Sequence, residues 1–313
     1  MEFEGKTILV AGAAGFVPHT LAKFYLEKGA RVIGLDNFIT GSPQNIDLLS
    51  KYPNFEFHHC NIYEHFPTFR KIDFIFSMAS PASPIDFNII PLEIMRVNSE
   101  GTLKLLELAR ETGARFLECS TSEVYGDPEI HPQVETYVGH VNPIGPRSCY
   151  DESKRFAEAL TMTYHRKFFV DTRIVRIFNT YGPGMRANDG RVIPNFINQA
   201  LRNEDLTVYG DGSQTRSFCY VDDLVRAMDA VMFCNDPTPF NIGNPDEYSI
   251  KECAKEIIKV LGSSSKIAYK PLPQDDPKQR QPDMSKLESV SSFKPMVSFH
   301  EGIKKTAAYF KNK

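Results

Sequence analysis

The sequence has no long apolar run, no marked excess of either charge and no repeat or low-complexity segment. Its 313 residues carry 36 Lys and Arg against 39 Asp and Glu, a formal net charge of −3, which indicates neither a nucleic acid nor an acidic membrane surface as partner. No stretch approaches the roughly 18 apolar residues that span a bilayer. The opening MEFEGK lacks the order of a signal peptide, basic and then apolar, so we expect a cytoplasmic protein.

Clustered cysteines and histidines are also lacking. The six cysteines include no Cys-x-x-Cys pair, so we expect reduced, mostly buried thiols and no metal site. Cys149 adjoins Tyr150 and could be a nucleophile, but the sequence fixes no histidine beside it, and a small core residue is the favoured interpretation. The six are Cys60, Cys119, Cys149, Cys219, Cys234 and Cys253.

The first forty residues predict a dinucleotide-binding βαβ unit. Residues 6–12 (KTILVAG) resemble a buried parallel strand, a glycine turn follows, residues 16–28 form an amphipathic helix, and residues 30–36 form a second strand that ends in Asp36. The glycines let the backbone approach a pyrophosphate at the helix N-terminus. Asp36 would accept hydrogen bonds from the ribose hydroxyls and repel a 2′-phosphate, so NAD is favoured over NADP.

One residue departs from this fingerprint. Pro18 stands at the third glycine position. Proline is tolerated in a first helical turn, but its ring fills space that glycine leaves for close packing of helix and strand. A purely structural glycine turn therefore stays open as the alternative to NAD binding.

Further apolar strands alternate with helices, which predicts an α/β fold with a doubly wound parallel sheet. We expect this Rossmann domain over residues 1–180, with some later segments returning to it, and a smaller C-terminal α/β domain over 181–313 that binds the sugar nucleotide. Residues 271–285, rich in proline and charge, are expected to form a solvated loop. The other expected strands are 55–61, 73–79, 115–122 and 172–178, and the helices are 92–112, 192–202, 221–233, 249–261 and 298–311, the last two with capping boxes.

A helix is also predicted from about Ser148, after the loop at Pro146. Tyr150 and Lys154 are four residues apart and therefore share one face of it. An ammonium beside a phenol favours the ionised phenol and would bring a pKa of about 10 toward working pH. This predicts Tyr150 as a general base, although the same spacing also arises from a half-buried aromatic residue beside a solvated lysine.

Taken together, these motifs resemble the extended short-chain dehydrogenases that act on sugar nucleotides, and among them most closely the UDP-glucuronate decarboxylases. The resemblance covers nearly the whole chain, and the GHVNPIGPR block is its most discriminating part. The matching segments are GAAGF (12–16), DNF (36–38), SPASP (80–84), NSEGT (98–102), TSEVYGDPEIHPQ (121–133), GHVNPIGPRSCYDESKR (139–155), RIFNTYGP (176–183), NDGRVIPNFI (188–197), LTVYGDGSQTRSF (206–218) and DDPKQRQPD (275–283).

The resemblance implies a lyase that uses NAD to decarboxylate UDP-glucuronate to UDP-xylose through a 4-keto intermediate. It also implies a homodimer paired through helices that include residues 150–168. The alternatives are a nucleotide-sugar 4,6-dehydratase or 4-epimerase, or a non-catalytic NAD-binding scaffold. Against dehydration, Ser122 stands where the dehydratases carry an aspartate.

The resemblance also implies residue roles. Tyr150 would act at the carbon 4 hydroxyl, and Lys154 would hold the nicotinamide ribose. Thr121 would donate to the developing oxyanion, and Glu123 would orient the sugar or assist proton transfer. Arg280 would grip the carboxylate or protonate carbon 5, although by itself it resembles a solvated loop charge. The NAD site would comprise Gly12, Gly15, Phe16, Val17, Asp36, Asn37, Phe38, Thr40, Gly41, Asn61, Ile62 and Ser80 with Tyr150 and Lys154, and the UDP site Asn179, Arg191, Tyr209, Gln214 and Arg216 with Arg280.

Some positions depart from the family pattern. Asn61 stands where an acid is common, Phe87 where a tyrosine is expected, Val138 replaces a tryptophan, and Ser153 replaces a frequent glycine. With Pro18, Asn61 predicts an altered affinity for NAD more than a lost function.

Overall fold

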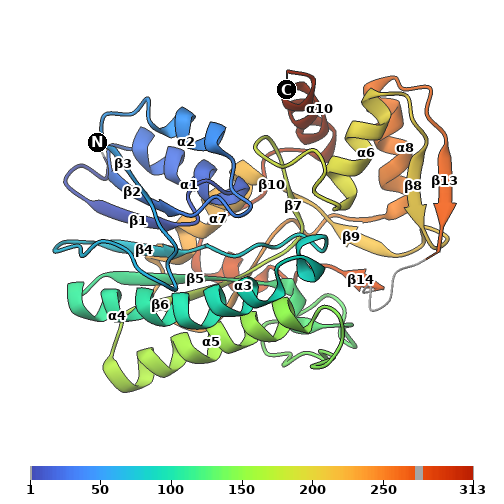
Figure 1. The fold of residues 1–313 in the computed structure, drawn as a ribbon. Helices are drawn as coiled ribbons and strands as arrows, with labels where there is room; N and C mark the ends of the chain where they lie inside the picture. Colours follow the sequence, from blue (N-terminus) through green and yellow to red (C-terminus); the bar gives the residue numbers. More distant parts are fainter. Residues whose placement is uncertain (1, 272–277, 313) are drawn as a thin grey trace.

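The computed structural model describes residues 2–271 and 278–312. Its main feature is a seven-stranded parallel sheet with the strand order β11-β6-β5-β4-β1-β2-β3 (Figure 1). The predicted doubly wound α/β fold is therefore confirmed. The strands are β1 (Thr7–Ala11), β2 (Arg31–Asp36), β3 (Phe55–His59), β4 (Phe74–Ser77), β5 (Arg115–Thr121), β6 (Thr172–Ile177) and β11 (Phe240–Ile242).

Helices cover both faces of this sheet, which explains why its inner strand β1 (TILVA) is apolar and fully buried. In β1, Ile8 and Val10 pack into one hydrophobic cluster, while Leu9 and Ala11 pack into another on the opposite face, because successive strand side chains alternate between faces. The first cluster contains residues of α1 (Phe16–Glu27), α2 (Pro43–Leu49) and α7 (Val221–Phe233), and α3 (Pro91–Arg96), α4 (Thr102–Thr112) and α5 (Ser148–Phe168) lie on the other side (Figure 1).

A smaller lobe stands beside the sheet and has its own hydrophobic cluster (Figure 1). It is built on the helices α6 (Val192–Leu201), α8 (Ile250–Leu261) and α10 (Phe299–Lys311). Two later segments return to the large domain: β11 is an edge strand of the large sheet, and α7 packs on that sheet. The small lobe also carries three short sheets. In these, β8 (Leu206–Tyr209) pairs with β13 (Ile267–Lys270), β9 (Thr215–Ser217) lies between β12 (Glu247–Ser249) and β14 (Gln279–Arg280), and β7 (Thr180–Tyr181) pairs with β10 (Cys219–Tyr220). The short helix α9 (Ser285–Val290) follows β14.

The expected helical segment over residues 92–112 is confirmed, with one difference: a π-helical turn, η2 (Val97–Gly101), lies between α3 and α4. The buried Asn98 lies in this turn. Its side-chain amide donates to the Ile94 carbonyl and to the hydroxyls of Ser80 and Ser153, at 2.9–3.1 Å. The π-turn thus lets one side chain join the end of β4 to α5, and such turns are frequent at functional sites.

The remaining helix predictions agree with the structure to within a residue or two at their ends. Ser249 and Glu252 complete a capping box at α8, whereas at α10 Ser298 accepts a hydrogen bond from the Glu301 N–H. Residues 272–277 of the expected solvated loop lie outside the described residues. Within residues 2–271 and 278–312, no helix combines the length and the apolar character that crossing a bilayer requires.

Candidate active site

A cavity of about 730 Å³ lies beyond the carboxyl ends of the parallel strands, where ligands bind in open α/β sheets. It is lined from the large sheet by residues that follow β1, β2, β4, β5 and β6, and from the small lobe by residues near β8 and β9. All the predicted site residues line it except Phe38 and Arg280. Those that line it are Gly12, Gly15, Phe16, Val17, Asp36, Asn37, Thr40, Gly41, Asn61, Ile62, Ser80, Thr121, Glu123, Tyr150, Lys154, Asn179, Arg191, Tyr209, Gln214 and Arg216.

The glycine turn forms one wall of the cavity. Gly12 has a φ of +83°, and an added Cβ would lie 2.9 Å from the Ala79 Cα and 3.0 Å from the Met78 carbonyl oxygen. Only glycine fits such a contact. The Gly15 N–H donates to the Gly12 carbonyl at 2.8 Å, and α1 begins at the next residue, so the N-terminus of a helix faces the cavity and offers an anion site.

Pro18 does not interrupt this arrangement. It lies buried in the first turn of α1 and lines the cavity beside the turn. The N–H that proline lacks would have no partner within the helix at this position. The substitution therefore keeps the helix intact and changes the shape of the cavity wall.

Asp36, at the end of β2, is held by backbone donors. Its Oδ1 accepts from the Phe38 N–H at 2.6 Å and its Oδ2 from the Ala14 N–H at 3.0 Å. Burial raises the pKa of Asp36, and these donors oppose the shift. Two carboxylate oxygens offer about four acceptor sites, so capacity remains for ribose hydroxyls. The glycine wall, the helix N-terminus and this carboxylate together fit NAD.

Phe38 itself does not line the cavity. Its backbone is left-handed, with a φ of +59°, and its ring packs 5.3 Å from the rings of Phe57 and His59. The predicted cofactor contact of its side chain is therefore corrected to a packing contact, while its N–H holds Asp36.

Tyr150 is buried in the cavity wall on α5, and Lys154 lies one helical turn further on. The predicted lowering of the phenol pKa is wrong for this structure: burial raises the pKa of Tyr150, although Lys154 and a hydrogen bond with Thr121 oppose it. The largest cause is the burial of the phenol, and the Lys154 ammonium that opposes this shift is also bound to β5. It donates to the Cys119 carbonyl at 2.6 Å and to Glu118 Oε1 at 3.3 Å, and Glu118 was not foreseen.

The Tyr150 ring has an aromatic neighbour. Phe87 stacks on it with ring centroids 5.0 Å apart and planes at 17°, and the Arg147 guanidinium lies 5.5 Å from the Phe87 centroid. Cys149 is buried, with its Sγ directed at the Phe87 carbonyl at 3.7 Å. Burial raises the pKa of this thiol, which agrees with the interpretation as a core residue, and all six cysteines are unpaired.

Glu123 lies among arginines. Arg147 donates to its Oε2, and Arg280 contacts the same oxygen at 3.3 Å. Burial alone would raise the pKa of Glu123, but the charges of nearby arginines outweigh it and lower the pKa to about 2. The carboxylate is therefore ionised at neutral pH. The three arginines that act on it are Arg280, Arg147 and Arg216.

Arg280 differs from both predictions made for it. It is neither a solvated loop charge nor a cavity residue, because it is 1% exposed and donates to the Ser122 carbonyl at 2.8 Å from behind Glu123. Its strand β14 pairs with β9 and brings it opposite Arg216. Arg147, which lines the cavity instead, was missed by sequence reasoning, although its place just before a predicted catalytic helix was a usable signal.

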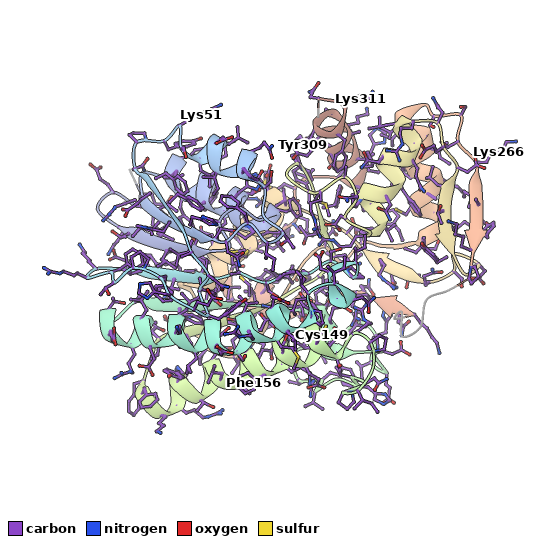
Figure 2. The ribbon with its side chains drawn as sticks, viewed as in Figure 1. Lys51, Cys149, Phe156, Lys266, Tyr309 and Lys311 are labelled. Carbon is purple, nitrogen blue, oxygen red and sulfur yellow. The ribbon has the colours of Figure 1, made fainter. Side chains whose placement is uncertain are left out.

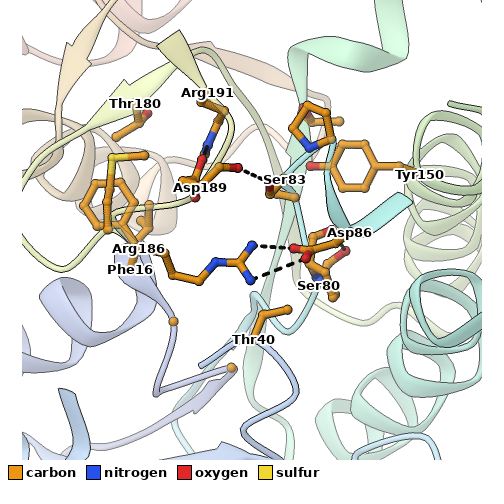
Figure 3. Close-up of a pocket in the computed structure, with 18 of the residues that line it drawn as sticks. Phe16, Thr40, Ser80, Ser83, Asp86, Tyr150, Thr180, Arg186, Asp189 and Arg191 are labelled. Atoms are coloured by element: carbon orange, nitrogen blue, oxygen red, sulfur yellow. Dashed lines mark hydrogen bonds and ion pairs between the residues drawn. The ribbon is translucent and has the colours of Figure 1, made fainter. Parts of the chain in front are cut away.

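Two loops meet across the cavity through charged pairs that the sequence did not predict (Figure 3). Arg186 donates to both oxygens of Asp86, at 2.6 and 3.3 Å. Ser83 donates to the Asp189 carbonyl, and the Asp189 carboxylate binds Arg191 in turn, at 2.8 Å for the Nη2 to Oδ2 contact. The Asp86–Arg186 and Ser83–Asp189 contacts connect residues 100 and 106 positions apart, which no local pattern could reveal, whereas Asp189 and Arg191 are near neighbours in the sequence.

The comparisons with known proteins agree with this geometry. The model of the NAD dependent epimerase/dehydratase family matches residues 8–243. UDP-glucuronic acid decarboxylase 1 of Xenopus tropicalis is 47% identical over 310 residues, which cover 99% of this chain and 73% of the relative. UDP-glucuronic acid decarboxylase 2 of Arabidopsis thaliana is 48% identical over 300 residues, 96% of this chain and 67% of that one.

Solved structures support the same kinship. An epimerase from Methanothermobacter thermautotrophicus superposes with a TM-score of 0.91 at 29% identity, over 99% of this chain and 93% of that one. UDP-glucuronic acid 4-epimerase from Bacillus cereus, solved with UDP-glucuronic acid and NAD, superposes with a TM-score of 0.88 at 28% identity, over 98% of this chain and 99% of that one. The predicted resemblance to the UDP-glucuronate decarboxylases is confirmed by the relatives, and the chain belongs to the NAD dependent epimerase/dehydratase family.

Proposed function

We propose that this chain is an NAD-dependent UDP-glucuronate decarboxylase that forms UDP-xylose through a 4-keto intermediate. One observation carries the proposal: a single cavity joins the glycine turn after β1 to buried Tyr150 and to the arginine cluster around Glu123. Identity of 47% to a UDP-glucuronic acid decarboxylase over 99% of the chain supports the choice of substrate.

The residues that would hold NAD are those of the glycine wall, Asp36 and Lys154. When bound, NAD supplies the two-electron oxidation of carbon 4 and its later reduction. Asp36 would accept from the adenosine ribose hydroxyls, and the α1 N-terminus would receive the pyrophosphate. Lys154 would reach the nicotinamide ribose with the N–H that remains after its bonds to Cys119 and Glu118.

Tyr150 acts as the base at the carbon 4 hydroxyl and takes its proton as that carbon becomes a ketone. The Thr121 hydroxyl stabilises the developing phenolate or oxyanion. The ketone lies β to the carboxylate, so the bond from carbon 5 to the carboxylate breaks, carbon dioxide leaves and the electron pair remains as an enolate. A proton from solvent adds at carbon 5. Carbon 4 then takes back its hydride from reduced NAD, Tyr150 returns its proton to the oxygen on carbon 4, and UDP-xylose results.

The arginine cluster supports the charge changes at carbon 5. Arg147 lines the cavity and can face the sugar carboxylate, and a guanidinium matches a carboxylate with a fixed pair of donors. Arg280 is a positioning residue that fixes Glu123, and Glu123 orients the sugar. The UDP is bound by the residues predicted for it that line the cavity, which are Asn179, Arg191, Tyr209, Gln214 and Arg216.

The proposal extends to a cytoplasmic homodimer that pairs through the layer of α3 and α5. Large apolar side chains are exposed on or next to these helices: Ile89 just before α3 and Leu92 are each 69% exposed, Met95 is 46% exposed, and Phe156 on α5 is 51% exposed. Phe156 is labelled on α5 in Figure 2. Exposed apolar side chains grouped on one face mark protein interfaces.

Turnover of purified protein with UDP-glucuronate, with and without added NAD, tests the function. Mass spectrometry would follow nucleotide products and carbon dioxide. We expect UDP-xylose with one carbon dioxide per turnover, and at least a roughly 100-fold loss of kcat in Tyr150→Phe. Tyr164→Phe is the matched control, because Tyr164 lies on the same helix and its hydroxyl bonds Glu107 away from the cavity.

The other outcomes separate the alternatives. A product with the mass of UDP-glucuronate but inverted at carbon 4, without carbon dioxide, would assign a 4-epimerase, which is the activity named for the Bacillus cereus neighbour. Bound NAD without turnover of UDP-glucuronate, UDP-glucose or dTDP-glucose would indicate a scaffold. A requirement for added NAD would connect Pro18 and Asn61 to loosened cofactor binding.

A further inference from the structure

Glu118 is a fully buried carboxylate in the middle of the large sheet. It lies on β5, opposite Ser77 of β4 and Ile174 of β6, and is 0% exposed. It shares the face of β5 with Phe116, which packs in the cluster of α4 and α5. A carboxylate is expensive to bury unless a charged partner compensates for its lost hydration, so its partner is informative.

That partner is Lys154. Its ammonium lies 3.3 Å from Glu118 Oε1 and is itself 4% exposed. Its other bond, to the Cys119 carbonyl, comes from the same strand. Within residues 2–271 and 278–312, Glu118 Oε2 has no hydrogen-bond partner. Burial raises the pKa of Glu118, and the charge of Lys154 is the largest contribution that opposes this shift, followed by a hydrogen bond with Ser77.

In the pair, Lys154 lies between Glu118 and the cavity. Lys154 and Tyr150 line the cavity, one helical turn apart, whereas Glu118 does not line it. We propose that Glu118 is a positioning residue that anchors the Lys154 ammonium to β5 and partly cancels its charge, and thereby sets the pH at which Tyr150 gains and loses its proton. The role rests on the proposed function, in which Tyr150 is the base.

The surrounding charges agree with this role. Burial lowers the pKa of Lys154, but Glu118, Tyr150 and Cys119 together outweigh burial and raise the pKa, with Glu118 as the largest of the three, so the lysine stays protonated. An ammonium paired with a carboxylate lowers the pKa of a nearby phenol less than an isolated ammonium does. Burial is the main cause of the raised pKa of Tyr150, and Lys154 opposes this shift without reversing it. The other titratable or charged groups that act on Tyr150 are Glu123, Asp151 and Arg191, and those that act on the pair are Cys119 and Glu158.

An attenuated lysine suits the proposed reaction. Tyr150 takes a proton from the hydroxyl on carbon 4 and must return it to that oxygen in the same turnover. A phenol made strongly acidic would ionise easily but would return the proton reluctantly, because proton transfer is efficient when donor and acceptor are closely matched. Glu118 would keep the phenol near that balance.

Glu118→Gln tests the proposal, because it removes the charge and keeps the shape. The pKa of Tyr150 would be followed by NMR of protein labelled with 13C in the tyrosine rings, with the Tyr150 signal identified from Tyr150→Phe. We expect the variant to ionise Tyr150 about one pH unit lower, and the acid limb of kcat to move with it. Glu118→Asp, which keeps the charge, should titrate near the wild-type value.

Asp223→Asn is the matched control. Asp223 on α7 is 1% exposed and paired with Arg226, and it does not line the cavity, so the variant loses a buried charge without touching Glu118 or Lys154. Its Tyr150 titration should stay within a few tenths of a pH unit of wild type. If Glu118→Gln does not fold, as judged by circular dichroism, Glu118→Met provides the same comparison.

Two results would overturn the proposal. An unchanged titration in the folded charge-removing variant would mean that Glu118 carries no charge that Tyr150 experiences, and an upward shift would mean that Lys154 loses its proton without Glu118. The titration needs no substrate. A shifted Tyr150 without carbon dioxide release therefore refutes the proposed function alone, and release with an unshifted Tyr150 refutes this inference alone.

Discussion

Removing the charge of Glu123 should weaken the fold as well as the chemistry. Its carboxylate contacts Arg147 and Arg280, and the field of these and of Arg216 lowers its pKa to about 2. In Glu123→Gln the arginines lose this partner, and an uncompensated buried charge is strongly destabilising. The change is therefore expected to be visible in thermal unfolding without any ligand.

The size of the effect follows from the pKa. A glutamate in an unfolded chain titrates about 2.5 units above the folded value, and at about 1.4 kcal/mol per unit the ionised form stabilises the fold by about 3 kcal/mol. Because the folded pKa is depressed, this contribution is present above about pH 4.5 and is lost as the pH falls toward 2. With an unfolding entropy of about 2.1 cal/mol/K per residue, it corresponds to about 5 °C in Tm for a chain of this length.

Calorimetry of wild type and Glu123→Gln between pH 4 and 8 would measure this difference. We expect the variant to unfold about 5 °C lower at pH 7.5 and the gap to narrow below about pH 4.5. Glu100→Gln is the control, because Glu100 forms an exposed pair with Arg96 and such pairs contribute little. Equal Tm values for wild type and Glu123→Gln at neutral pH would refute the reasoning that the cluster depends on this charge.

Two further predictions concern binding. Gly12→Ala places a Cβ 2.9 Å from the Ala79 Cα and should weaken NAD binding at least about 10-fold in isothermal titration calorimetry. Gly113→Ala, at a left-handed glycine with open space around it, should leave the affinity for NAD unchanged. Equal affinities of the two variants for NAD would contradict the role of the glycine turn in the cofactor site. Asp86→Asn weakens the bidentate pair with Arg186 and should raise KM for UDP-glucuronate about 10-fold in steady-state kinetics with little change in kcat. A loss confined to kcat would contradict that role.

The local pattern of the chain determined most of the scaffold. The run of residues 6–12 predicted a strand buried on both faces, and β1 packs into a different cluster on each side. Many residues that line the cavity could be predicted from the sequence, among them Gly12, Asp36 and Tyr150. They follow strands or begin helices, and the carboxyl ends of parallel strands converge on one edge of the sheet.

The interactions that set charge at the site were decided by tertiary structure. The spacing of Tyr150 and Lys154 follows from helix geometry, but the carboxylate of Glu118 that engages the lysine comes from another element, 36 residues earlier. The same holds for Asp86 with Arg186 and for Arg280 behind Glu123. A pKa depends on burial and on every charge nearby, and neither can be read from spacing along the chain, because only folding brings those groups together.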